Sequence, residues 1–93
     1  MRITGETDRI YLATRATCTI DDPGLGRKIT IGKTGSETTV VWNPWMERAK
    51  AIADIGDDEW TAFVCVETCN VGDAAVRLAA GAEHTMTATI QVA

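Results

Sequence analysis

The sequence predicts a mainly β fold, an antiparallel β-sandwich or part of one, with one short helix. Apolar and polar residues alternate in 27–33 and 84–92, as in strands with one buried face. Turn-forming residues such as Gly, Asp and Pro separate the short apolar runs. Only residues 45–52 space their apolar side chains as a helix does. A chain of 93 residues suffices for one small domain, so we expect residues 1–93 to form a single domain.

The first half of the chain contains four predicted strands. Residues 1–12 and 16–20 supply the first two, and Asp21–Gly26 then forms a turn on composition. Residues 27–33 and 38–42 supply the next two, with a short glycine-containing loop between them. Because both runs are rich in β-branched residues and the loop is short, we expect them to pair as a β-hairpin.

A short helix follows the fourth strand. Pro44 suits the first turn of a helix, and Asn43 is a suitable cap ahead of it. Apolar side chains then recur at helical spacing in Trp45, Met46, Ala49 and Ile52. We expect this helix to end near residues 54–56. The acidic cluster 57–59 is interpreted as a solvated loop, since consecutive residues cannot all converge on one metal ion.

Residues 60–71 form the most hydrophobic run and are predicted to be a strand with both faces covered. Glu67 lies inside it, and a carboxylate in such surroundings needs an ion-pair partner, hydrogen bonds or a wet cavity. Two interpretations remain open. Glu67 is either a structural partner of an arginine such as Arg9 or Arg27, or a catalytic base whose pKa burial would raise.

The end of the chain supplies two further predicted strands, 75–78 and 84–92, separated by a turn at 79–83. In the last strand one face is apolar and the other polar, which predicts half burial. His84 stands at the start of this strand and is expected to be a solvated or edge residue. It is the only histidine, so no Cys/His spacing indicates a zinc site.

The composition of the chain indicates which classes of binding partner and which cellular location to expect. The net charge of −4 does not favour nucleic acid or an anionic membrane surface. No apolar run approaches the roughly 20 residues that span a bilayer. The cysteines, Cys18, Cys65 and Cys69, are odd in number, and the last two are too far apart on one strand to bond each other. We therefore expect free thiols and a cytoplasmic location.

Five segments occur in an order and spacing that resemble a known family. They are Thr7–Tyr11, Val40–Trp45, the Asp57-Asp58 loop, Phe63–Glu67 and the closing pattern Leu78, Gly81, His84-Thr85-Met86. Together they resemble the C-terminal part of a D-hexose-6-phosphate mutarotase (glucose-6-phosphate 1-epimerase). This family belongs to the galactose-mutarotase-like group, whose fold is a large β-supersandwich. The resemblance covers essentially the whole chain.

The resemblance implies roles for four residues. Glu67 matches the general base that takes the proton from the anomeric hydroxyl. Asp8 matches an aspartate that hydrogen-bonds sugar hydroxyls, although a turn cap or a surface pair with Arg9 is its commoner use. Trp42 and Asn43 match a motif that helps to shape the pocket wall, or else serve as core aromatic and helix cap. The implied ligand is a hexose phosphate or related sugar, and the implied chemistry needs no metal or organic cofactor.

The resemblance also implies that the chain is a C-terminal fragment. Members of the family are about three times this length, the size of one large sandwich domain. Their histidine acid and phosphate-gripping residues belong to earlier segments, and His84 matches a turn instead. We therefore expect little or no mutarotase activity from the isolated chain.

Whether the chain is an enzyme remains open at this stage. The alternative is a non-catalytic β-sandwich module for carbohydrate binding or oligomerisation. A cut sandwich would expose apolar side chains such as Trp42, Trp45, Trp60 and Phe63, so we expect a homodimer or higher oligomer.

Overall fold

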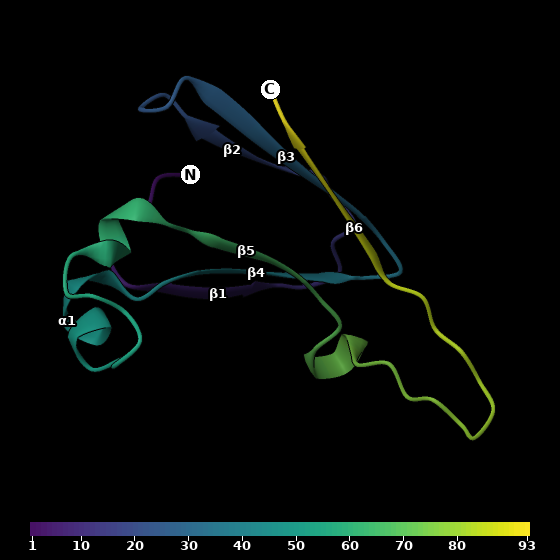
Figure 1. The fold of residues 1–93 in the computed structure, drawn as a ribbon. Helices are drawn as coiled ribbons and strands as arrows, with labels where there is room; N and C mark the ends of the chain where they lie inside the picture. The colour runs from purple at the N-terminus through teal and green to yellow at the C-terminus, as the bar shows by residue number, and fades with distance from the viewer. The chain divides into compact units, whose positions relative to one another are not determined.

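The computed structural model describes all residues 1–93 and is built mainly of β-strands (Figure 1). In chain order the elements are β1 (Thr7–Tyr11), β2 (Cys18–Asp22), β3 (Arg27–Thr34), β4 (Thr38–Asn43), α1 (Trp45–Lys50), η1 (Glu59–Ala62), β5 (Cys65–Cys69), η2 (Gly72–Ala74) and β6 (Thr87–Val92), where η marks a 3-10 helix. The predicted fold class, mainly antiparallel β with one short α-helix, is confirmed.

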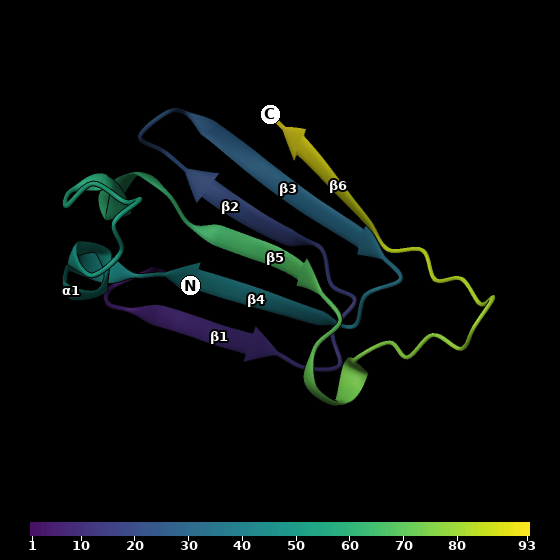
Figure 2. The same ribbon diagram turned by 60° about the horizontal axis from the view of Figure 1, so that its bottom comes forward.

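The strands form two three-stranded sheets. One has the order β1-β4-β5 and the other the order β2-β3-β6. In each sheet the middle strand runs opposite to both of its neighbours (Figure 2). The most buried strand is β4, whose Thr38, Val41 and Asn43 are at most 9% exposed. The candidate site residues are therefore arranged around a well-buried central strand.

The predicted hairpin between residues 27–33 and 38–42 is wrong. Both segments are strands, but β3 and β4 belong to different sheets. β3 pairs with β2 across the turn at Pro23–Gly26, where the Arg27 Nε atom lies 2.9 Å from Asp22 Oδ2. The link after β3 instead turns at Gly35, whose φ of +72° is a left-handed conformation that glycine adopts without strain.

The β2-β3-β6 sheet has one apolar and one polar face. Paired residues in register share a face, and Ile20 lies opposite Ile29, Ile29 opposite Val92 and Ile31 opposite Ile90. The central Ile31 is only 8% exposed. The predicted half burial of the last strand is wrong, however, because every residue of β6 is exposed. As an edge strand, β6 has a neighbour on one side only.

Two other predicted strands differ in the structure. Residues 60–71 begin with η1, and only Cys65–Cys69 is a strand. The Nδ2 atom of Asn43 donates hydrogen bonds to the carbonyls of Trp60 and Phe63, so these carbonyls are not left for a sheet ladder. Residues 75–78 are irregular and follow η2. The helix is also shorter than expected, because it ends at Lys50.

The contacts within the chain divide it into two compact units. Unit 1 comprises Met1–Ile10 and Val40–Glu67, and unit 2 comprises Tyr11–Thr39 and Thr68–Ala93. Val41 and Ala49 form the buried apolar core of unit 1, and Ile31 is its counterpart in unit 2. That the 93 residues form a single domain remains a prediction.

Candidate functional site

The four residues predicted from the sequence lie on the three strands of one sheet. Asp8 is on β1, Trp42 and Asn43 are at the end of β4, and Glu67 is on β5. All four belong to unit 1. Because β4 is the middle strand, the two carboxylates stand on opposite flanking strands with Trp42 and Asn43 between them. The topology therefore brings all four residues to one sheet.

Glu67 has an exposed side chain in the middle of β5. The expectation that it lies among covering apolar residues is therefore wrong, because the strand is shorter than predicted and only partly buried. Arg27, one of the two arginines considered as its partner, pairs with Asp22. An exposed carboxylate at mid-strand is accessible to a ligand, as a general base must be.

Cys65 reports on the surroundings of Glu67. The two residues are separated by one position on β5, so their side chains leave the same face of the strand. Burial, and secondarily the negative charge of Glu67, raise the pKa of the Cys65 thiol. The thiol therefore stays protonated beside the carboxylate at neutral pH.

Asn43 is a structural junction. The residue is 2% exposed, and its Nδ2 donates to the carbonyl oxygens of Trp60 at 3.0 Å and Phe63 at 2.7 Å. Its Oδ1 accepts from the backbone N–H of Trp45 at 2.9 Å. Trp45 starts the helix with a φ of +59°, an uncommon conformation for a residue other than glycine. The Asn43 amide thus links the start of α1 to the segment 60–63.

Aromatic rings pack in pairs around this junction. The ring of Trp42 lies 5.9 Å from that of Phe63, and the rings of Trp45 and Trp60 are 4.5 Å apart, both pairs tilted. Such offset pairs stabilise beyond their area burial by about 0.5–1.5 kcal/mol each. Trp42 is half-buried rather than fully covered. Trp42 therefore packs against Phe63 while the residue as a whole keeps some solvent exposure.

Asp8 is exposed on the edge strand β1. The neighbouring Thr7 hydroxyl donates to the carbonyl of Gly5 at 2.9 Å, which fixes the entry into the strand. An exposed carboxylate on a fixed strand can accept hydrogen bonds from sugar hydroxyls.

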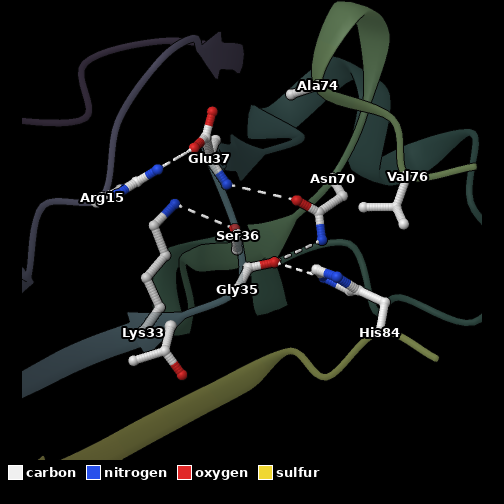
Figure 3. A pocket seen from close by; sticks show the side chains of 10 residues that line it. Arg15, Lys33, Gly35, Ser36, Glu37, Asn70, Ala74, Val76 and His84 are labelled. Carbon is white, nitrogen blue, oxygen red and sulfur yellow. Dashed lines mark hydrogen bonds and ion pairs between the residues drawn. The ribbon is translucent and has the colours of Figure 1, made fainter.

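Sequence reasoning missed a hollow of about 550 Å³ in unit 2 (Figure 3). Its lining combines charged, polar and small apolar residues: Arg15, Lys33, Thr34, Gly35, Ser36, Glu37, Asn70, Ala74, Val76 and His84. His84 was expected to be a solvated or edge residue. It is exposed, but its Nε2 lies 2.8 Å from the carbonyl oxygen of Gly35. Because a carbonyl only accepts, this nitrogen carries the proton.

The charged groups of the hollow are largely used by the protein itself. The Lys33 ammonium donates to Ser36 Oγ, the Thr38 carbonyl and Thr39 Oγ1 at 2.8–3.2 Å. Arg15 pairs with Glu37, and this guanidinium holds the pKa of the Glu37 carboxyl below its usual range. The hollow is therefore primarily a hydrogen-bonded corner between segments distant in sequence.

The structure contains no group of three or more His, Cys, Asp or Glu side chains arranged to hold a metal ion. None of the three cysteines forms a disulfide bond. No helix has the length and apolar character required to cross a bilayer.

Comparison with known proteins identifies the family. The family model for aldose 1-epimerase matches residues 1–91. The chain belongs to the aldose 1-epimerase family. Its relatives include proteins provisionally named glucose-6-phosphate 1-epimerase in Cenchrus ciliaris and Escherichia coli, each 39% identical over 66 and 62 residues respectively. The matches cover 71% and 67% of this chain.

The matched region of this aldose 1-epimerase family member spans about a fifth of each relative, 20% and 21% respectively. A third relative, from Salmonella typhimurium, carries the same provisional name and is 39% identical over 62 residues. No solved structure matches the chain at a significant level.

Proposed function

We propose that this chain is part of a hexose-6-phosphate 1-epimerase and that Glu67 is its general base. The observation that carries the proposal is the family match along residues 1–91, a range that includes the exposed mid-strand carboxylate of Glu67. The provisional names of the relatives favour a hexose 6-phosphate as substrate. The three cysteines form no disulfide bond, which favours the cytoplasm as location.

The proposed reaction interconverts the α and β anomers through the open-chain sugar. Glu67 removes the proton from the hydroxyl on C1, while an acid donates a proton to the ring oxygen. The bond between C1 and the ring oxygen breaks, and C1 becomes an aldehyde. Rotation about C1–C2 and reclosure on the other face invert C1, and the two protons return. The net reaction consumes no proton, so one acid and one base suffice.

The other residues of the sheet would position the sugar. We propose that Asp8 accepts hydrogen bonds from sugar hydroxyls and that the accessible part of Trp42 forms a wall of the pocket. Asn43 contributes indirectly, because its Nδ2 hydrogens and its Oδ1 are already engaged with backbone groups. We propose that the acid and the phosphate-binding residues belong to other segments of the enzyme, because the match spans only about a fifth of each relative. Within this chain, Nε2 of His84 is engaged with the carbonyl of Gly35.

The decisive experiment grafts this chain onto a relative. The matching segment of the Escherichia coli relative is replaced by the corresponding residues of this chain, and anomer exchange of glucose 6-phosphate is followed by NMR. We expect the graft to catalyse exchange and Glu67→Gln to lower the rate by about 10²–10⁴-fold. Glu83→Gln, a matched change at another exposed glutamate, should leave the rate unchanged. An equal rate with Glu67→Gln would refute the role of this carboxylate.

The isolated chain supplies a second measurement. We expect it to accelerate exchange little, because Glu67 acts there without its acid partner. Shifts in the amide resonances of Asp8 and Glu67 on addition of glucose 6-phosphate would support binding at the sheet. Shifts confined to unit 2 would contradict the proposed site.

The second candidate is a non-catalytic, self-associating module. It is favoured by the contrast between three buried apolar core residues and a large set of exposed ones, including Leu78, Ile90 and Val92 at 58–67% exposure. So much exposed apolar surface is typical of a protein that buries it against a partner. A graft that folds but shows no exchange would favour this candidate over the enzyme.

A further inference from the structure

The outer edge of β6 is an unpaired strand edge. β6 ends the β2-β3-β6 sheet, and β3 is its sole neighbour there. The Lys28 N–H bonds to the Ala93 carbonyl at 2.8 Å and the Ala93 N–H to the Lys28 carbonyl at 2.9 Å. Residues 28 and 93 are thus a hydrogen-bonded pair, and such pairs alternate along an antiparallel ladder.

This alternation fixes which backbone groups point outward. Gln91 and Thr89 face Thr30 and Gly32 in hydrogen-bonded positions. The intervening Ala88, Ile90 and Val92 therefore direct their N–H and C=O groups away from β3. These three residues offer a row of donors and acceptors to another strand.

The β6 edge also lacks the usual protection against pairing. Proteins guard open edges with charged side chains, prolines or bulges. Thr87–Val92 contains no charged residue and no proline. The strands at the other three sheet edges all carry charge, at Asp8 and Arg9 on β1, Asp21 and Asp22 on β2, and Glu67 on β5.

We propose that β6 pairs antiparallel with β6 of a second copy of this chain, about a twofold axis at Ile90. In this register Ile90 faces its own copy and Ala88 faces Val92, and each pair exchanges two backbone hydrogen bonds. On the other face the polar side chain of Thr89 lies opposite the polar side chain of Gln91 of the second copy. Both faces match themselves and no like charges meet, which favours a second copy over an unrelated strand.

The pairing would join the β2-β3-β6 sheets of the two copies into one six-stranded sheet. The apolar face formed by Ile29, Ile31, Ile90 and Val92 would then extend across both copies. A strand edge buries little area, so the dimer should dissociate on dilution. The inference rests on the self-association proposed above and does not depend on the epimerase chemistry. A failed graft assay would leave it intact.

A charge-pair experiment tests the register. Sedimentation of the unaltered chain from micromolar to submillimolar concentration should show a monomer–dimer equilibrium. Ile90→Lys and Ile90→Glu should each be monomeric, because like charges then face each other across the axis. An equimolar mixture of the two variants should dimerise again. Gln91→Lys, which adds the same charge where it faces Thr89, is the matched control and should still dimerise.

Three results would overturn the proposal: a monomeric unaltered chain, a dimer that survives Ile90→Lys, or folded Ile90 variants that do not associate when mixed. Amide hydrogen exchange on the unaltered chain tests it without any substitution. Protection of the Ala88, Ile90 and Val92 amides should rise with protein concentration. Exchange of these amides at the unprotected rate in a dimeric sample would also refute it.

Discussion

At the scale of single residues, Asn43 shows how a buried amide can fix the backbone beside a candidate site. Both of its donor hydrogens and its acceptor are used on backbone groups of Trp45, Trp60 and Phe63. The sequence predicted a helix cap or a pocket residue. In the structure Pro44 is the N-cap residue of α1, and Asn43, just before it, accepts a hydrogen bond from the Trp45 N–H. The bonds to the carbonyls of Trp60 and Phe63 were not foreseeable from sequence, because these partners lie 17 and 20 residues away.

Asn43→Ala should lower the free energy of unfolding by about 2–4 kcal/mol, because it leaves buried backbone groups without partners. Asn43→Asp keeps the acceptor for Trp45 but loses both donors, so its loss should be similar or greater at neutral pH and should lessen as the carboxyl is protonated. Urea unfolding measures both. Unchanged stability in Asn43→Ala would contradict the junction.

Cys65 offers a direct test of the charge on Glu67. Because that charge helps to raise the pKa of the Cys65 thiol, Glu67→Gln should lower this pKa and speed alkylation of Cys65 at mildly alkaline pH. Burial is the larger cause, so the pKa should stay above its ordinary value. The rate at Cys18 serves as internal control.

The same shift has a consequence for stability. A thiol pKa raised by folding contributes stability that is fully present below its unfolded pKa and is lost as the pH rises through the folded value. Glu67→Gln should therefore reduce the sensitivity of the fold to alkaline pH. An unchanged alkylation rate of Cys65 in this variant would show that no charge at Glu67 acts on the thiol.

At the scale of elements, the corner between β3 and β4 depends on Gly35. A Cβ at this position would collide with the backbone of Thr85 and Met86, and the φ of +72° disfavours other residues. We expect Gly35→Ala to lower the free energy of unfolding by more than about 3 kcal/mol. Gly72→Ala, at φ +61° with nothing within 4 Å of the added Cβ, should cost about 1 kcal/mol. Similar losses in urea unfolding would contradict the collision.

The elements also show what the sequence can and cannot encode. Alternation correctly predicted the strand character of 27–33 and of most of 84–92, and β-branched composition that of 38–42. It could not say which strands pair, because period-two patterning marks a face and not a neighbour. The failure at residues 60–63 has another cause. Their aromatic and β-branched composition favours a strand, but a contact from Asn43 holds their carbonyls elsewhere.

At the scale of the whole molecule, the four candidate site residues came from a resemblance that the family match supports. Physical reasoning alone left the role of Glu67 open and predicted burial where the structure has exposure. Sequence reasoning could not predict the hollow in unit 2. Its lining residues Arg15, Lys33, Asn70 and His84 are brought together by pairing between strands far apart in sequence. Composition could argue against a zinc site, but it could not predict which side chains are in contact.

The carbonyl of Gly35 accepts from both Asn70 and His84, at 3.0 and 2.8 Å. When the ribosome makes this protein, that oxygen is present long before either donor, since His84 is synthesised 49 residues later. β3 can pair with β2 as soon as both have been synthesised, because a four-residue turn joins them. Its other neighbour, β6, is synthesised only after His84. The corner is thus completed only after His84 and β6 have been synthesised, and a nascent chain that stalls before them would leave one edge of β3 unpaired.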